Sequence, residues 1–291
     1  MRISTAMRTD AAMANLQRLE AEHHDAATEA STGARLITPS KDPVAAARAV
    51  RVQASIDRTK ALGETIRDVR GDLELSESAL ASATDILARI RELTMSASSE
   101  SMSDDGRKLL ATEVATLKGE LVSLANTKGA QGFLFGGTQT ATPPFSALGA
   151  FTGNDLPRDV EISPGSTVRA NASGASAFTA AGGVDVFKTL DTLDAALQAG
   201  DADQVAATLA SIDASHRQVV DARARIGMTL SRLDVTDAVH AEVVTSLSAT
   251  LHGLVDADLP AAYSRLVTLQ QRIEQAIGVT RQILAMSSQQ L

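Results

Sequence analysis

The longest regular pattern in this sequence runs from Val205 to Leu254 and reads VAATLASIDASHRQVVDARARIGMTLSRLDVTDAVHAEVVTSLSATLHGL. Along it, one set of positions recurs at strictly alternating steps of three and four residues, the spacing of one face of a helix. The pattern predicts a very long helix that packs against a partner through a narrow apolar stripe. The positions of the stripe are Val205, Leu209, Ile212, His216, Val219, Arg223, Ile226, Leu230, Leu233, Asp237, His240, Val244, Leu247, Leu251 and Leu254.

Similar spacing extends upstream of this stretch. From Pro43 to about Ser98 there is no further proline, and a second stripe predicts another long helix that begins with Asp42 as its cap. A polar turn at Ser98 to Asp105 separates it from a shorter helical pattern, and helices resume at about Asp185. The long second stripe consists of Leu62, Ile66, Val69, Leu73, Ser76, Leu80, Ala83, Leu87 and Ile90.

Each end of the chain carries its own amphipathic pattern. The N-terminal stripe ends near Gly33, and the C-terminal one begins after the phase of the long pattern slips at Asp256–Asp258. Neither helix can bury its stripe alone, so each needs the other end or a neighbouring subunit as a partner. The two stripes are Ala12, Leu16, Leu19, His23, Ala26 and Ala30, and Leu259, Ala262, Leu266, Leu269, Ile273, Ala276, Thr280 and Ile283.

The middle of the chain differs from both flanks. All six phenylalanines lie between Phe133 and Phe187, and glycine and proline are concentrated in the same region. Short apolar pieces between turn pairs predict a β-rich insert. The predicted fold is therefore mainly α with a small β insert. It is an elongated antiparallel helical bundle or coiled coil of N- and C-terminal segments, with a β-rich domain in the middle.

Three parts follow from these patterns. Residues 1–41 and 256–291 are expected to form a terminal coiled-coil assembly segment. Residues 42–132 and 184–255 are expected to form a long-helix domain, and residues 133–183 a β-rich insert. The composition, with 44% hydrophobic and 21% charged residues, is typical of a folded protein.

Composition excludes several partners and chemistries. A formal net charge of -8 gives no general attraction to nucleic acid or to an anionic membrane, and no apolar run is long enough to span a bilayer. The start of the chain leads into a mixed polar segment rather than a signal-peptide hydrophobic region, so any export would use a different route. The absence of cysteine excludes disulfides and thiolate sites.

No residue pattern points to catalysis. His23, His216 and His240 fall on the helical stripes, where polar residues set register, and the sequence has no HExxH spacing. Asp256 and Asp258 lack the glycine and glutamate of a calcium loop. The glycines around residues 132–137 lack the spacing that cradles phosphate and suit a hairpin turn. We expect no catalytic residue, no cofactor and no metal, and hence no enzyme.

Four motifs of the sequence occur together: Met1–Thr5, Ser31–Gly33 with Pro39–Ala47, Gly132–Thr140 with Pro144–Phe145, and Asp256–Leu259 with Leu266–Gln271. In this order they resemble the flagellin-like proteins of the bacterial flagellum, and within them the junction proteins between hook and filament. The resemblance also implies that residues 133–183 face outward. Two residues depart from the family pattern: Lys41 replaces a usual acidic residue, and Pro260 stands where the family continues a helix, which predicts a kink or break.

The resemblance implies a structural role in motility. The termini would line the inner tube of a helical or ring-shaped homo-oligomer. The other junction protein would lie on the hook side, flagellin on the filament side, and an export chaperone would hold the C-terminal helix. It also implies secretion through the flagellar export apparatus. On this basis the predicted assembly contacts are Leu16, Leu19, Leu259, Leu266, Leu269, Ile273 and Ile283.

Two alternatives remain open at this point. One is flagellin itself, the filament subunit, against which the short insert and the Gly132–Thr140 segment weigh. The other is a coiled-coil scaffold or signalling protein with an enzymatic insert, which would not be found outside the cell.

Overall fold

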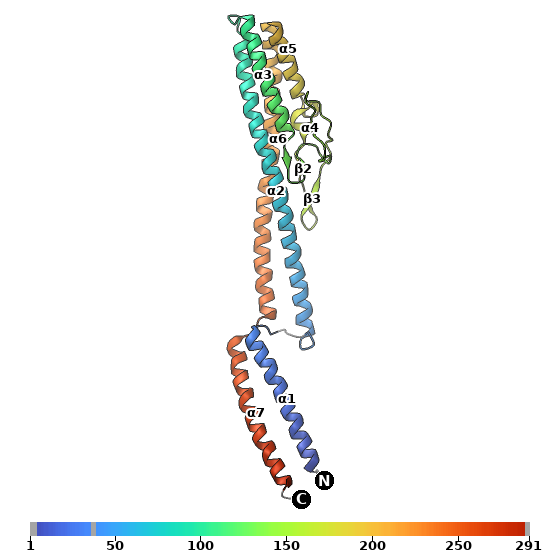
Figure 1. Ribbon diagram of the computed structural model, residues 1–291, viewed down its shortest axis with the longest axis vertical. Coiled ribbons are helices and arrows are strands. Elements are labelled where there is room, and N and C mark those ends of the chain that lie inside the picture. The colour runs from blue at the N-terminus through green and yellow to red at the C-terminus, as the bar shows by residue number, and fades with distance from the viewer. Residues whose placement is uncertain (1–4, 36–38, 289–291) are drawn as a thin grey trace. The chain divides into compact units, whose positions relative to one another are not determined.

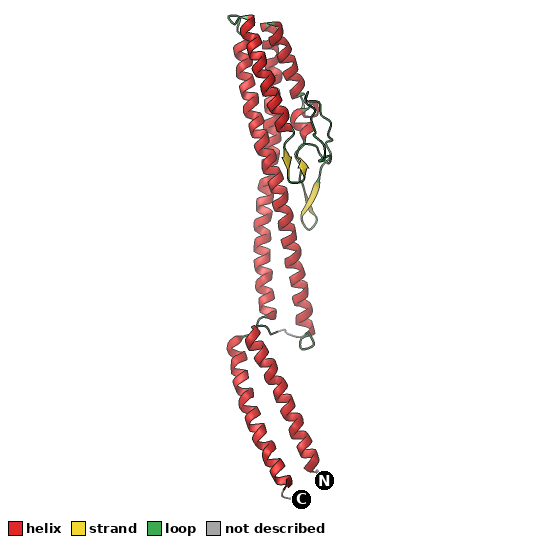
Figure 2. Ribbon diagram, viewed as in Figure 1, coloured by secondary structure: helices red, strands yellow, loops and turns green. Residues whose placement is uncertain are grey.

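The computed structural model describes residues 5–35 and 39–288, so most of the first motif lies outside the described residues. The described residues form mostly helices, and two short strand pairs occur in the middle of the chain (Figures 1 and 2). The prediction of a mainly α fold with a small β insert is confirmed. The long helices are α1 (Thr5–Thr32), α2 (Pro43–Ala97), α3 (Asp104–Ala125), α5 (Val186–Ala199), α6 (Ala202–Val255) and α7 (Leu259–Ser288).

The chain divides into two compact units. Unit 1 comprises residues 1–58 and 243–291, and so contains α1, α7, the first part of α2 and the last part of α6. Unit 2 comprises residues 59–242 and contains the remaining helices together with the phenylalanine-rich segment. The predicted division into three parts stays a prediction.

Short polar residues begin the helices, as their local chemistry requires. The Oδ1 atoms of Asp42, Asp201 and Asp258 accept hydrogen bonds of 2.9, 3.0 and 3.2 Å from backbone N–H groups in the first turns of α2, α6 and α7. Gly200 ends α5 with a left-handed φ of 71°, which favours a residue without Cβ. The predicted break between the two C-terminal stripes is therefore confirmed, and Pro260 lies in the first turn of α7.

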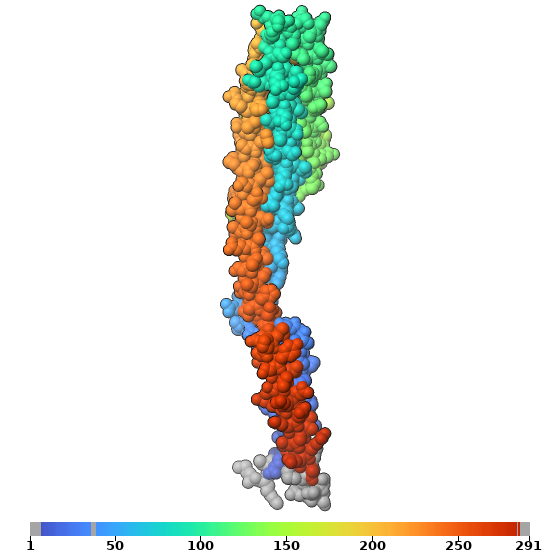
Figure 3. All heavy atoms as spheres, turned by 90° about the vertical axis from the view of Figure 1, so that its left-hand side faces the viewer, coloured from blue at the N-terminus to red at the C-terminus, as the bar shows by residue number. Residues whose placement is uncertain are grey.

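Four helices supply the core of unit 2. In Figure 3, α2 and α6 lie side by side, and α3 and α5 add further apolar side chains to the same cluster. Every position of the predicted α6 stripe is buried or half-buried, and so is every position of the predicted α2 stripe. The helical periodicity therefore identified the packed faces correctly. Leu80, Leu87, Leu121, Leu193 and Val219 are among the fully buried side chains of this core.

The phenylalanine-rich segment contains less strand than its sequence suggests. Its hairpins pair β1 (Lys128–Gly129) with β2 (Gly132–Phe133) and β3 (Asp159–Ser163) with β4 (Ser166–Arg169), both antiparallel. A short helix, α4 (Gly174–Phe178), and a 3₁₀ turn, η1 (Ala180–Gly182), follow. The segment instead coheres through its rings: Phe135, Phe145, Phe151, Phe178 and Phe187 pack with centroids 5.1–5.9 Å apart.

Polar side chains tie this segment to the helices of unit 2. Asn126 at the end of α3 exchanges two hydrogen bonds with the backbone of Phe145, of 2.9 and 3.0 Å. Arg158 forms a 3.1 Å ion pair with the buried carboxylate of Asp72 on α2. Because these groups lie in the interior, losing either partner would leave a polar group unsatisfied.

Gln218 on α6 makes the densest of these connections. Its buried amide nitrogen donates to the carbonyl oxygens of Ala177, Thr179 and Val184 at 3.0–3.2 Å, and its Oε1 accepts from Val184 N–H at 2.9 Å. The Gln218 side chain thus provides hydrogen-bond partners for the backbone of a loop that is not paired in a sheet. The segment around η1 is held in place mainly by this contact.

Replacing Gln218 with Leu should destabilise unit 2 by about 2–4 kcal/mol, because buried carbonyl and N–H groups would lose their partner. We expect the Tm in thermal unfolding to fall by roughly 4–16 °C. Gln204→Leu, at an exposed position of the same helix, is the matched control and should leave the Tm nearly unchanged. Equal Tm values for the two variants would contradict the assigned role of Gln218.

Candidate assembly surface

The two terminal helices α1 and α7 pack against each other in antiparallel orientation within unit 1 (Figure 1). Leu19 and Leu269 are only 9% and 4% exposed, and they share a small apolar cluster with Ala26. Leu266, Ile273 and Ala276 complete it from the side of α7. Alanine on α1 keeps this seam narrow, so leucine and isoleucine from α7 can fill it. The chain therefore supplies both partners that the sequence required.

Most of the predicted assembly residues lie at this seam, and one does not. Leu19 and Leu269 are buried, whereas Leu16, Leu266, Ile273 and Ile283 are half-buried. Leu259 is the exception, because it is the first residue of α7 and is 42% exposed. Whether any of these side chains contacts a neighbouring subunit stays a prediction.

The segments that follow α1 and α6 are held together by main-chain hydrogen bonds. Arg35 N–H donates to Val255 O at 2.6 Å, and Ala257 N–H donates to Gly33 O at 2.9 Å. Gly33 has a φ of 68°, which lets the chain turn directly after α1. These two hydrogen bonds fix where α7 begins beside α1. The glycine that the sequence placed at the helix end thus also positions the helix pair.

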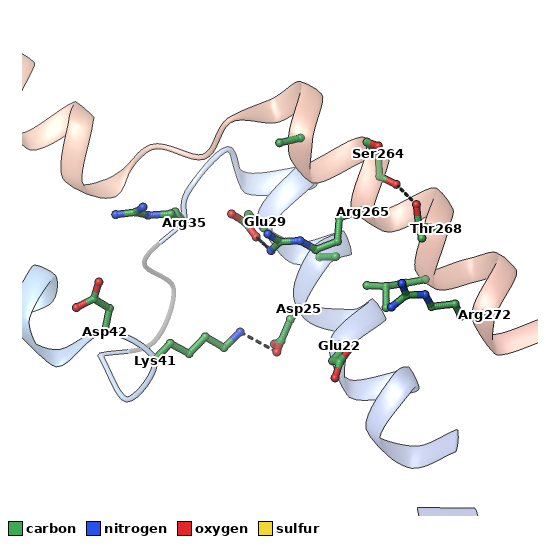
Figure 4. A pocket seen from close by; sticks show the side chains of 13 residues that line it. Glu22, Asp25, Glu29, Arg35, Lys41, Asp42, Ser264, Arg265, Thr268 and Arg272 are labelled. Carbon is green, nitrogen blue, oxygen red and sulfur yellow. Dashed lines mark hydrogen bonds and ion pairs between the residues drawn. The ribbon is translucent and has the colours of Figure 1, made fainter. Parts of the chain in front are cut away.

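A charged pocket of about 910 Å³ opens on one side of the pair, beside this turn (Figure 4). The Nζ of Lys41 lies 2.7 Å from a carboxylate oxygen of Asp25, and Arg265 reaches from α7 toward Glu29 at 3.6 Å. Lys41, which departs from the family pattern, thus has an acidic partner on α1. Because the Lys41–Asp25 pair is about half-exposed, it should contribute only about 0–1 kcal/mol.

A second, more apolar pocket of about 620 Å³ adjoins the first at Arg272, which lines both. Its walls combine small or aliphatic residues of α1 and α7, including Ala11, Ala12, Ala276 and Val279, with polar residues such as Arg8, Asn15 and Gln275. We call the two pockets together the pair groove. The seam periodicity did not reveal this groove, because its lining combines seam residues such as Leu19 and Leu269 with polar residues beside the seam.

The described parts of the chain offer no arrangement suited to metal chemistry. Within residues 5–35 and 39–288, no three His, Asp or Glu side chains gather closely enough to hold an ion. Buried His240 lies with its Nε2 3.0 Å from Ser163 Oγ, where it attaches the tip of the β3–β4 hairpin to α6. Over the same described ranges, no helix is long and apolar enough to cross a membrane. The arrangement is suited to packing between helices.

Comparison with known sequences agrees with this geometry. Residues 3–140 match the profile of the bacterial flagellin N-terminal helical region. Flagellar hook-associated protein 3 of Salmonella typhimurium is 29% identical over all of this chain and 99% of its own length, and that of Escherichia coli is 28% identical over 94% of both. Flagellin of Listeria monocytogenes is 29% identical, but over only 72% of this chain and 70% of its own length.

Solved structures share the fold. A flagellar hook-associated protein from Vibrio parahaemolyticus matches 74% of this chain and 100% of its own with a TM-score of 0.69 at 23% identity. A Xanthomonas campestris FlgL structure matches 70% of this chain and 99% of its own with a TM-score of 0.61 at 22% identity.

The sequence similarities of this chain lie within the flagellin family. Within that family, the similarity that extends over nearly the full length of both partners is to hook-associated protein 3.

Proposed function

We propose that the chain is a structural subunit of the bacterial flagellum that joins the hook to the filament. The observation that carries this proposal is the end-to-end match with hook-associated protein 3, which covers all of this chain and 99% of the relative. Flagellin is the weaker alternative, because the flagellin match covers a smaller share of both chains. The proposed role is structural rather than catalytic.

The α1/α7 pair is the proposed means of assembly. We propose that the pair is a coiled coil and that Leu16, Leu19, Leu266, Leu269 and Ile273 hold it in the form that neighbouring subunits recognise. Leu259 and Ile283 would extend this assembly contact at its two ends. Burial of apolar surface between subunits, at about 25 cal/mol per Å², would then drive their stepwise addition. Folding of the terminal helices would be completed by that assembly.

The partners follow from this role. We propose a homo-oligomer in a ring or helical assembly, with the other junction protein on the hook side and flagellin on the filament side. Export through the flagellar secretion apparatus, with a chaperone on the C-terminal helix, would deliver the subunit. The terminal pair would face the inside of the tube, the long helices would form the next layer, and residues 133–183 would face outward as a β-rich insert.

Immunogold labelling of isolated flagella tests the proposal. We expect a single short band of label between hook and filament. Label along the whole filament would identify the chain as flagellin. Absence of label from the isolated flagella, with the chain detected only in the cell fraction, would favour a scaffold or signalling protein. A strain that lacks the chain should release flagellin into the medium instead of extending a filament from the hook.

A further inference from the structure

The outer surface of α7 carries apolar side chains that the α1/α7 seam does not use. Leu259, Tyr263 and Val267 follow one another at i, i+4 and i+8, so they lie along one face of the helix. They are 42%, 55% and 55% exposed. We call these three residues the outer stripe. A line of large apolar residues left in water marks a contact surface.

The outer stripe and the pair groove lie on different sides of the pair. At 3.6 residues per turn, Tyr263 lies roughly 160° around α7 from Arg265, which lines the groove. None of the three stripe residues lines either pocket of the groove. The pair therefore presents an apolar ridge on one side and a hollow on the other.

The groove has the composition to accept such a ridge. Its smaller half is lined by alanines of both helices with Leu19, Val279 and Ile283, and also by the polar residues Arg8, Asn15, Arg272, Gln275 and Thr280. Small side chains let another helix approach closely, toward the 8–10 Å at which packed helix axes lie. Tyr263 and Val267 would fill volume that alanine leaves open.

Charge sets the direction of this contact. Glu274 is exposed and lies seven residues after Val267, so it continues the outer stripe by about two turns. In the smaller half of the groove the charged lining residues are Arg8 and Arg272, which attract a carboxylate on the entering helix. The larger half combines basic residues with Glu22, Asp25, Glu29 and Asp42. The ridge of one copy thus complements the groove of another.

We propose that adjacent copies of this chain contact each other head to tail, the outer stripe of one copy entering the pair groove of the next. The inference rests on the proposed function and adds which surfaces meet. Because the two surfaces differ, a pair of copies keeps one free groove on the first copy and one free ridge on the second. Such heterologous contacts produce rings or helical arrays rather than closed dimers.

Cross-linking tests the contact in assembled flagella, because the chain has no native cysteine. Val267→Cys would be combined with Ala11→Cys in one half of the groove, or with Ala261→Cys in the other half. With a short bis-maleimide, at least one double variant should give a ladder of dimers, trimers and larger species. Val267→Cys with Leu109→Cys, which lies on an exposed part of α3, is the matched control and should give none.

Each other outcome has a defined meaning. A dimer from Val267→Cys alone would show stripe-to-stripe contact and overturn the proposal. No ladder from either groove variant, in flagella that contain the protein, would overturn it while leaving the proposed function intact. Absence of the unmodified chain from flagella would instead refute the proposed function.

Purified full-length chain provides a second measurement that does not require incorporation into flagella. Tyr263 is the only tyrosine and there is no tryptophan, so intrinsic fluorescence reports on the outer stripe directly. As concentration rises and the chain associates, we expect acrylamide quenching of Tyr263 to fall roughly twofold as the ring enters an interface core. Unchanged quenching in samples that sediment as oligomers would overturn the proposal.

Discussion

Replacing Leu269 with Asp is expected to prevent incorporation of the chain into flagella while unit 2 keeps its helical core. Leu269 is 4% exposed and packs in the cluster of Leu19 and Ala26. The variant loses about 2 kcal/mol of apolar burial and places a carboxylate in an apolar seam. A total cost of about 4 kcal/mol would shift the equilibrium between paired and unpaired helices by about a thousandfold. The amount of variant in purified flagella, relative to culture supernatant, measures the effect.

Gln270→Asp is the matched control for this substitution. It introduces the same carboxylate one residue further along α7, at an exposed position outside the seam. We expect near-normal incorporation of the control, and circular dichroism should show loss of helix only in Leu269→Asp. Normal filament attachment in the Leu269 variant would mean that the α1/α7 pair is not required for assembly.

Phe145→Ala should produce the largest loss of stability in unit 2. Its ring is 2% exposed and contacts Phe151, Phe178 and Phe187 with centroids 5.1–5.6 Å apart. Removing the Phe145 ring leaves a cavity between the three neighbouring rings and lowers the free energy of unfolding by about 3–5 kcal/mol. For a unit of this size, the Tm should fall by roughly 6–20 °C. Differential scanning calorimetry of the full chain would measure this shift.

Leu148→Ala is the control for that cavity. Leu148 is 77% exposed in the same part of the chain, so its truncation leaves the ring cluster intact. Its Tm should change by no more than about 2 °C, as is usual for surface substitutions. If the two variants unfold at the same temperature, the phenylalanine cluster does not hold the insert together.

Helix positions were the most predictable part of the fold. The stripe from Val205 to Leu254 lies entirely within α6, and every one of its positions is at least half-buried. The helix ends predicted at Gly33, Gly200 and Asp256–Asp258 also match the observed ends of α1, α5 and α6. Periodicity and capping act over one or two turns, so residues close in sequence contain the whole signal.

The middle of the chain was less predictable. Glycine and proline indicated turns, yet the residues between them form only two short strand pairs, α4 and η1. The ordering of this segment depends on Gln218 of α6, which lies 34 residues from Val184, and on Asn126 after α3, which lies 19 residues from Phe145. Such contacts have no local pattern, because the two partners meet only after the chain has folded.

The candidate assembly surface was likewise only partly predictable from the sequence. The seam residues of α1 and α7 could be read from their spacing, but Leu259 was expected in the seam and is exposed. The pair groove was not foreseen, because the spacing along one helix does not show where two packed helices leave space between their side chains. Tyr263 and Val267 could have been noticed as large apolar residues on the polar side of a predicted helix.

The sequence by itself determined which segments are helical, where each helix ends and which face it buries, because these properties arise from neighbouring residues. Only the tertiary structure decided that α7 pairs with α1 of the same chain and which apolar residues this pairing leaves exposed. An amphipathic stripe specifies that a partner is needed, whereas the identity of the partner depends on complementary shape and on the turn that joins Gly33 to Ala257.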